Sequence, residues 1–138
     1  MQKLFIPSTL TTPEISFSPE DNYFMIKGNS APEDVRSLYY PVIEWIRIFV
    51  DDLLEGEYPK YNKENPLRFQ TDLHYFNSSS AKFLFDIFNE LKRLQTKEFP
   101  LVIDWNYESD DLDQKEAGID IALLVEMEFN YIAHQKNN

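Results

Sequence analysis

Two hydrophobic periodicities meet without an intervening loop in the stretch LRFQTDLHYFNSSSAKFLFDIFNELKRL, residues 67–94. Apolar residues and one threonine occupy every second position from Leu67 to Tyr75, which predicts a strand with one buried face over Leu67–Phe76. From Ala81 onward the apolar residues recur at helical spacing. The polar run Asn77–Ser80 lies at the junction, and both residue types are preferred at helix N-termini. The stretch therefore predicts a strand that passes directly into a helix.

Downstream of this stretch the strand and helix patterns repeat. Alternating apolar residues predict a strand over Leu101–Tyr107, and the acidic segment Ser109–Asp111 can cap a helix that reaches about Val125. Alternation over Met127–Ala133 then predicts a closing strand, for which a helix is the alternative. The carboxyl-terminal third of the chain is thus expected to form a strand, a helix and a second strand.

Upstream, the pattern predicts a hairpin ahead of the first helix. Apolar residues alternate over Glu14–Ser18 and again over Tyr23–Lys27, and the turn-rich segment Ser18–Asn22 separates them. Leu4–Ile6 is a candidate edge strand. The amino-terminal part is therefore expected to contribute two or three strands.

A long first helix is predicted to open at Ser30. Ser30 and Glu33 have the spacing of a capping box, in which each side chain satisfies a free backbone N–H group. Helical spacing continues through Pro41 as far as Leu53. We therefore expect one helix, kinked at the proline, that ends near Gly56.

The order of these elements predicts the fold class. Strands separated by helices need crossover connections, so the sequence predicts an α/β domain with a mixed β-sheet and crossover helices. The chain has 138 residues and shows no internal repeat or interdomain linker. We therefore expect a single small domain over residues 1–138.

The charge of the chain limits its partners. Lys and Arg number 13 against 24 Asp and Glu, for a formal net charge of -11. Nucleic-acid binding needs a basic face, and an anionic membrane surface would repel such a chain. No stretch approaches the roughly 18 apolar residues of a membrane span. We expect protein partners, no nucleic acid and no membrane insertion, although the same charge also serves solubility.

No convergent set of catalytic groups can be written from the sequence. The chain has no cysteine, which fits a cytoplasmic location, and its three glycines form no phosphate-binding loop. The histidines, His74 and His134, are interpreted as surface residues. The acidic run Glu108–Asp113 lacks the spacing of a calcium loop, so acids at a helix N-terminus are the simpler interpretation. We expect no catalytic residue, no metal and no cofactor.

The junction at Asn77–Ser80 is richer in hydroxyl groups than its structural role requires. One residue would suffice to cap the helix. A hydroxyl at a helix N-terminus can be phosphorylated without disturbing a core, and the phosphate adds roughly -1.5 to -2 charges. The helix dipole tolerates that anion, whereas a partner docked there would have to desolvate it. Regulatory phosphorylation is therefore one interpretation, and simple capping is the other.

Several segments taken together resemble the SiaC family of regulatory phosphoproteins. They are TPEI at 12–15, G-x-S-x-P-E at 28–33, Y-x-P-x-x-x-W at 39–45, L-x-Y-F-N-S-S-S-x-K at 73–82 and W-x-Y at 105–107. The resemblance spans nearly the whole chain in the right order. It implies a fold similar to STAS (anti-sigma-factor antagonist) domains, no enzymatic activity, and partner switching.

The resemblance also implies three partners and a phosphoacceptor. A kinase of the histidine-kinase-ATPase type phosphorylates such proteins, and a metal-dependent PP2C-type phosphatase removes the phosphate. The unphosphorylated form binds and activates a diguanylate cyclase, which raises cyclic di-GMP and promotes biofilm formation. The family acceptor, commonly a threonine after Tyr-x-Asn, falls on Ser78, and Ser79 and Ser80 are the alternative acceptors.

A switch surface is expected around the acceptor. Asn77 and Ser79 would orient the loop, and Lys82, about one helical turn on, would pair with the phosphate. Pro13, Glu14 and Glu33 are expected to reach the same end of the sheet. Helix capping is an equally good explanation for Glu33.

Two rival functions stay open at this point. The first is an acidic protein-interaction domain without phosphoregulation, in which the serines only cap a helix. The second is an enzyme that uses Asp110, Asp111 and Asp113 with a divalent cation.

Overall fold

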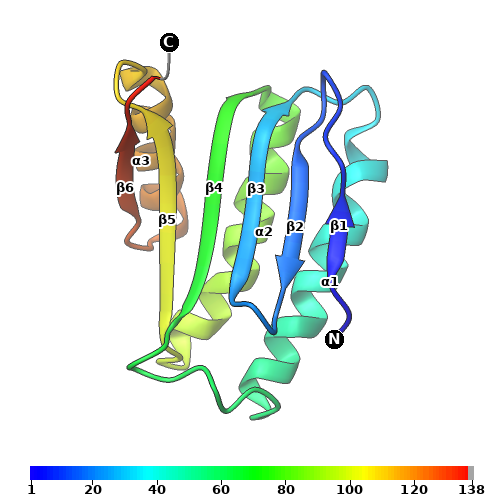
Figure 1. Cartoon of the computed structure of the whole chain (residues 1–138), viewed down its shortest axis with the longest axis vertical. Coiled ribbons are helices and arrows are strands. Elements are labelled where there is room, and N and C mark those ends of the chain that lie inside the picture. The colour runs from blue at the N-terminus through cyan, green and yellow to red at the C-terminus, as the bar shows by residue number, and fades with distance from the viewer. Residues whose placement is uncertain (137–138) are drawn as a thin grey trace.

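The computed structural model describes residues 1–136, which form six strands and three helices (Figure 1). The strands are β1 (Leu4–Ile6), β2 (Glu14–Ser18), β3 (Tyr23–Ser30), β4 (Leu67–Phe76), β5 (Leu101–Glu108) and β6 (Asn130–His134). The helices are α1 (Val35–Leu54), α2 (Ser78–Thr96) and α3 (Leu112–Val125). The predicted α/β class is confirmed.

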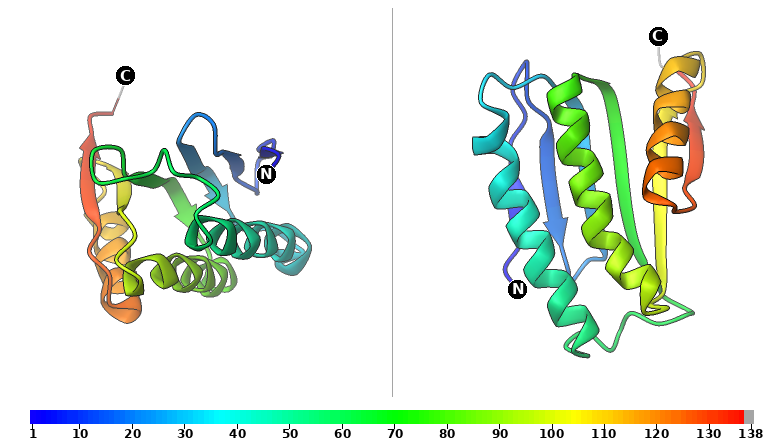
Figure 2. Two further views of the ribbon diagram at one scale, coloured as in Figure 1. Left: turned by 90° about the horizontal axis from the view of Figure 1, so that it is seen from below. Right: turned by 180° about the vertical axis from the view of Figure 1, so that it is seen from behind.

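All six strands lie in one mixed sheet whose spatial order follows the sequence. The pairs β1–β2 and β2–β3 are antiparallel, and the later pairs are parallel. Each parallel step carries a crossover helix and moves in the same direction. Crossovers of one hand therefore place α1, α2 and α3 on the same face of the sheet (Figure 2). The likeness to STAS domains stays a prediction.

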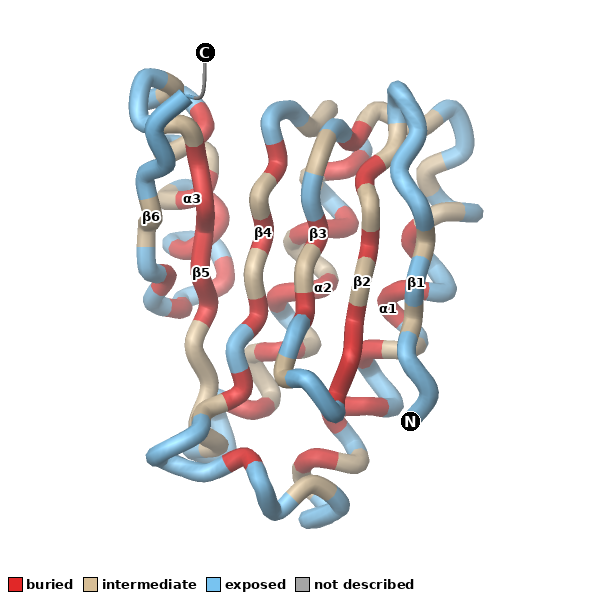
Figure 3. The backbone as a smooth tube through the Cα atoms, viewed as in Figure 1, coloured by how far each residue is buried: buried red, intermediate tan, exposed pale blue. Residues whose placement is uncertain are grey.

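The core lies between the sheet and the helix layer, where buried segments of neighbouring strands align (Figure 3). Trp105 of β5 is fully buried there and donates its indole N–H to the carbonyl oxygen of Gln114 at 3.0 Å. Gly118 faces the same indole, and a Cβ at that position would come within 2.6 Å of the ring. Helix α3 can therefore lie close against β5 because residue 118 has no side chain.

None of the three helices covers the opposite face of the sheet, which is polar. Asp104 and Asn106 lie on that face of β5, yet only 2% and 5% of their surface is exposed. Arg68 Nη1 lies 2.5 Å from Asp104 Oδ2, and Asn106 Nδ2 donates to the carbonyl oxygen of Thr71 at 3.1 Å. The hydrogen bonds offset the burial of these polar groups.

The start of α1 corrects the predicted capping box. Ser30 is the last residue of β3 and is fully buried, and the helix begins only at Val35. Asp34 is the N-cap residue, and its carboxylate accepts the backbone N–H of Ser37 at 3.1 Å. Glu33 lies exposed in the connection. Ser30 is unavailable as a cap because strand pairing holds it inside the sheet.

The end of β4 departs from the predicted alternation. Gly28 of β3 aligns with Leu73, but the next residue of β3 aligns with Tyr75, so His74 is an extra residue in β4. A bulge of this kind shifts the side-chain alternation by one position. Tyr75 is consequently 55% exposed, while Phe76 packs against the core. The prediction that Tyr75 shares the buried face is wrong.

The remaining elements agree with the sequence predictions. The edge strand, the hairpin and a single first helix through Pro41 are confirmed. A closing strand is confirmed over the helix alternative, although it begins at Asn130 rather than Met127. The N–H of Met127 instead donates to the carbonyl oxygen of Ala122 at 3.0 Å, which closes the end of α3.

Candidate functional site

The carboxyl end of β4 passes into α2 through Asn77. The N–H of Asn77 donates to the carbonyl oxygen of Ser30 at 3.0 Å, and its side-chain oxygen accepts the N–H of Ser80 at 2.9 Å. Its extended backbone, with φ -83° and ψ 174°, suits an N-cap residue. Asn77 therefore joins the ends of β3 and β4 to the first turn of α2, and the predicted cap is confirmed.

The three successive serines occupy different environments in the first turn of α2. Ser78 is exposed, and its hydroxyl makes no hydrogen bond to the part of the chain that the structure describes. Ser79 is also exposed, and its hydroxyl donates to Asn77 Oδ1 at 3.1 Å. Ser80 is fully buried and donates to the carbonyl oxygen of Ser30 at 3.0 Å. The sequence gives no sign of this division.

A buried hydroxyl network lies beneath the serines. Ser30 Oγ donates to Ser80 Oγ at 2.8 Å and lies 2.6 Å from the phenolic oxygen of Tyr39. Burial raises the pKa of Tyr39, so its phenol stays protonated and can donate to Ser30. The network ties α1 to β3 and α2. Sequence reasoning missed it, because residues 30 and 80 meet only through the pairing of β3 with β4.

The outer surface beside the serines is aromatic and carries one cation. Tyr40 is 56% exposed and meets Phe83 edge-on, with ring centroids 5.6 Å apart. Lys82 Nζ lies 4.8 Å from the centroid of Phe83 and 3.1 Å from Asp86 Oδ2. Lys82, expected to pair with a phosphate, thus has a carboxylate partner in this structure.

A groove of about 450 Å³ runs from this surface between the two long helices. We call it the α1–α2 groove. Its lining residues are Tyr40, Ile43, Glu44, Arg47, Phe83, Asp86, Asn89 and Glu90. On α2 the groove therefore begins at Phe83, five residues after Ser78, and it continues along both helices.

The other predicted switch residues lie near the same end of the sheet but not in the same patch. Pro13 is buried beside the bulge, with its Cα 3.7 Å from where a Cβ on Gly28 would lie. Glu14 Oε2 is 3.3 Å from Lys27 Nζ on the helix-free face. Glu33 is exposed in the connection before α1. The structure thus groups Asn77, Ser78, Ser79 and Lys82 and sets Pro13 and Glu14 apart from them.

The acidic run and the histidines have structural explanations. Asp111 is the N-cap of α3, which confirms the helix-start interpretation. His74 Nδ1 lies 3.3 Å from Glu108 Oε1, and His134 is exposed at the end of β6. Within residues 1–136, no three acidic or histidine side chains are grouped so that they could hold a metal ion. No helix in that range is long and apolar enough to cross a bilayer.

Most of the chain matches a family model. A family model described as SiaC family regulatory phosphoprotein matches residues 6–134. The chain belongs to the SiaC family. The resemblance inferred from the sequence segments is thereby confirmed, and the matched range includes Ser78 and the residues around it.

Solved structures of SiaC from Pseudomonas aeruginosa share this fold. Apo-SiaC is 26% identical, with a TM-score of 0.78 over 99% of this chain and 100% of that chain. SiaC in complex with the diguanylate cyclase SiaD, which it activates, is 27% identical, with a TM-score of 0.80 over 95% and 99%. An uncharacterized protein of Pseudomonas aeruginosa (strain UCBPP-PA14) is 30% identical over 108 residues, 78% of each chain.

Proposed function

We propose that this SiaC-family chain is a phosphorylation-controlled adaptor in the cytoplasm with no catalytic activity of its own. Unphosphorylated, it binds and activates a diguanylate cyclase, and phosphorylation of Ser78 turns this binding off. A kinase of the histidine-kinase-ATPase type adds the phosphate, and a PP2C-type phosphatase removes it. Membership of a family of regulatory phosphoproteins supports the regulation, and the SiaC–SiaD complex supports the choice of effector.

The exposure of Ser78 is the observation that carries this proposal. A kinase must reach the hydroxyl oxygen of its target. The hydroxyl of Ser80 is inaccessible, because Ser80 is fully buried and hydrogen-bonded to Ser30. Ser79 is accessible, but its hydroxyl is engaged by Asn77. Ser78 is exposed and free of such a bond within residues 1–136. It is therefore the serine that can be modified at the smallest structural cost.

A phosphate on Ser78 is compatible with the fold. The N–H groups of the first helical turn have no carbonyl partners within the helix, and no acidic residue lies in the first turn of α2. The helix dipole therefore favours an anion at this position. Lys82 could turn toward it at little cost, because its exposed pair with Asp86 is worth at most about 1 kcal/mol. The phosphate is thus expected to act on a partner and not on the fold.

The α1–α2 groove is the proposed contact surface for the cyclase. Its first residue on α2, Phe83, stacks on Tyr39 with ring centroids 5.6 Å apart and an interplanar angle of 7°. The hydroxyl network therefore fixes the aromatic end of the groove relative to the serines. A partner packed along the groove would meet the phosphate of Ser78 at that end. Desolvating this charge without a matching cation disfavours the complex.

A binding titration tests the switch. The chain is produced unmodified and with phosphoserine at position 78, and each form is titrated with a SiaD-like diguanylate cyclase from the same organism. We expect the phosphate to weaken binding at least about tenfold, or roughly 1.4 kcal/mol, and to reduce cyclase activation in parallel. Ser109→Asp is the control, since it adds charge at an exposed serine in a different loop at this end of the sheet.

Two outcomes would change the proposal in different ways. Unaltered cyclase binding by the folded phosphoserine protein would favour the rival function, an acidic interaction domain without phosphoregulation. The acceptor is tested separately by treating Ser78→Ala and Ser79→Ala variants with the cognate kinase and measuring the mass of the products by mass spectrometry. If the added phosphate persisted in Ser78→Ala and disappeared in Ser79→Ala, the acceptor would be Ser79.

A further inference from the structure

Strand β5 extends beyond the strand on its outer side. Among the described residues, β4 pairs with β5 over Leu101–Trp105, whereas β6 pairs with it over Asp104–Glu108. Residues 101–103 therefore have a neighbouring strand on one side and none on the other. Successive residues of a strand direct their backbone N–H and C=O groups to alternate sides. At least one of these three residues consequently presents its backbone groups to the open side.

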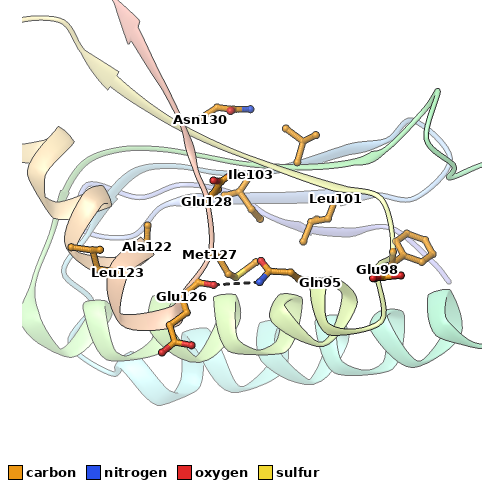
Figure 4. Close-up of a pocket in the computed structure, with 12 residues that line it drawn as sticks. Gln95, Glu98, Leu101, Ile103, Ala122, Leu123, Glu126, Met127, Glu128 and Asn130 are labelled. Carbon is orange, nitrogen blue, oxygen red and sulfur yellow. Dashed lines mark hydrogen bonds between the residues drawn. The ribbon is translucent and has the colours of Figure 1, made fainter.

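The chain between α3 and β6 does not close this edge. Glu126, the residue that follows α3, has a left-handed backbone conformation, and the N–H of Met127 donates back to the carbonyl oxygen of Ala122. Gln95 Nε2 of α2 donates to the carbonyl oxygen of Glu126 at 3.3 Å (Figure 4). These bonds hold the connection on α2 and α3. The edge of β5 at residues 101–103 is left facing a cleft.

This cleft, which we call the β5 cleft, has a volume of about 720 Å³ and is lined by both apolar and polar side chains. Leu101 and Ile103 line it from the sheet, and Leu123 and Met127 line it from the end of α3 and the connection. Leu123 is 72% exposed, so most of its surface is not covered by residues 1–136. A second hollow of about 330 Å³ adjoins the cleft and shares Leu123 and Met127 with it.

The rim of the β5 cleft is acidic. Glu98, Glu126 and Glu128 all line it and are all exposed. Lys92 Nζ lies 3.4 Å from Glu126 Oε2 and compensates one of these charges. The chain as a whole carries a formal net charge of -11. A segment with basic side chains would therefore be attracted to the rim, and an acidic one would be repelled.

We propose that the β5 cleft binds an extended segment of a partner protein, in which apolar and basic residues alternate, by strand addition to β5. Main-chain hydrogen bonds to residues 101–103 would hold the segment, its apolar side chains would enter the cleft, and its basic side chains would face the rim glutamates. A helix satisfies its own backbone groups and would leave the edge of β5 unpaired. The open edge is what selects an extended partner.

The β5 cleft is separate from the proposed phosphorylation site. Ser78 begins α2, whereas Gln95, which lines the cleft, lies in its last turn. A helix of 19 residues spans roughly 28 Å at 1.5 Å per residue. The inference does not rest on phosphorylation, and Ser78→Asp is expected to leave binding at the cleft unchanged.

Peptide display on the intact chain tests this inference. Random 12-residue peptides are selected on the immobilised protein, and the strongest binder is synthesised and titrated by NMR with amide hydrogen exchange. We expect alternating apolar and basic residues in the selected peptides and new protection of amides within residues 101–103. Leu123→Glu should lower the affinity at least about tenfold. Leu124→Glu is the matched control, since Leu124 is 70% exposed on the same helix but outside the cleft.

Charge-reversal variants test the role of the acidic rim, and a dimerisation measurement tests whether a second copy of the chain occupies the cleft. Glu128→Lys should weaken the same peptide, whereas Glu116→Lys, exposed on α3 away from the cleft, should not. The proposal is overturned if no peptide is enriched, if bound peptides leave residues 101–103 unprotected, or if both leucine variants bind equally. Concentration-dependent dimerisation that Leu123→Glu abolishes and Leu124→Glu preserves would replace the partner segment with a second copy of the chain.

Discussion

The two long helices begin at the same end of the sheet, yet their first turns are built differently. Helix α2 follows β4 through Asn77 alone, and the N–H of Asn77 is held by the end of β3. Helix α1 is separated from β3 by residues 31–34 and is capped by the exposed carboxylate of Asp34. The start of α2 is therefore anchored to the core through Asn77 and Ser80, whereas the start of α1 lies at the surface.

This difference explains why identical hydroxyl groups have opposite roles. Ser80 is buried because the first turn of α2 is held against Ser30 of β3. Ser78, two residues earlier, lies on the outer side of the same turn. A rigid helix start thus presents one free hydroxyl in a fixed position. The less constrained start of α1 offers no comparable site.

Replacing Ser80 with aspartate should break the start of α2 and give the largest effect. A carboxylate there could accept the Ser30 hydroxyl, but its charge would be buried and it has no proton to donate to the carbonyl oxygen of Ser30. We expect a loss of about 3 kcal/mol or more in the free energy of unfolding, measured by urea denaturation. Ser78→Asp is the matched control and should stay within about 0.5 kcal/mol of the parent. Similar losses in both variants would contradict the division between the two serines.

Removing the cap of α2 should cost less but still more than removing the cap of α1. Asn77→Ala deletes the acceptor for the N–H of Ser80, and we expect a loss of about 1–2 kcal/mol in urea denaturation. Asn77→Asp keeps an acceptor and should retain most of the free energy of unfolding that Asn77→Ala loses. Asp34→Ala should give a smaller loss, because water can replace that exposed cap. An equal loss in the two alanine variants would show that the contrast between the helix starts is wrong.

The link between the two helix starts should be worth about one hydrogen bond. Tyr39→Phe removes the phenol that lies 2.6 Å from Ser30 Oγ, and we expect it to cost about 1 kcal/mol in the same assay. Tyr40→Phe is the control, since Tyr40 is adjacent and 56% exposed. No difference between the two variants would mean that the network joins the helices without stabilising them.

The sequence predicts those features that depend on neighbouring residues. Alternation identified β4 and helical spacing identified α2 because each element has one face on the core. A cap within Asn77–Ser80 was predicted because capping acts within one turn, and the structure assigns it to Asn77. The α/β class follows from the order of such locally defined elements.

The errors arise where pairing between distant segments decides the outcome. The capping box at Ser30 was wrong because β3 pairs with β4 as far as Ser30. Tyr75 was assigned to the wrong face because the register between these strands shifts at Gly28. The same pairing buries Ser80 and leaves Ser78 outside. The candidate site could therefore be found in the sequence, but its three serines could not be told apart.

A pH titration of the two caps gives the smallest expected effect and the finest comparison. Hydrogen bonds from the hydroxyl and the backbone N–H of Ser37 lower the pKa of Asp34 below its ordinary 3.8. A carboxyl with a lowered folded pKa stabilises the fold above its unfolded pKa, and that contribution is lost as pH falls through the folded pKa. The cap of α1 should therefore weaken only in acid, whereas Asn77 has no group that titrates there.

The backbone amide resonances of Ser37 and Ser80 report the two caps separately in one NMR experiment. Between pH 6 and pH 2.5 the Ser37 amide should shift with a midpoint below 3.8, because its acceptor is the Asp34 carboxylate. The Ser80 amide should not follow, since its acceptor is the neutral amide of Asn77. In Asp34→Asn the cap remains but the Ser37 shift should vanish. If the Ser80 amide moved with the same midpoint, the contact between Ser30 and Ser80 would be coupling the helix starts, and the start of α2 would not be fixed independently of α1.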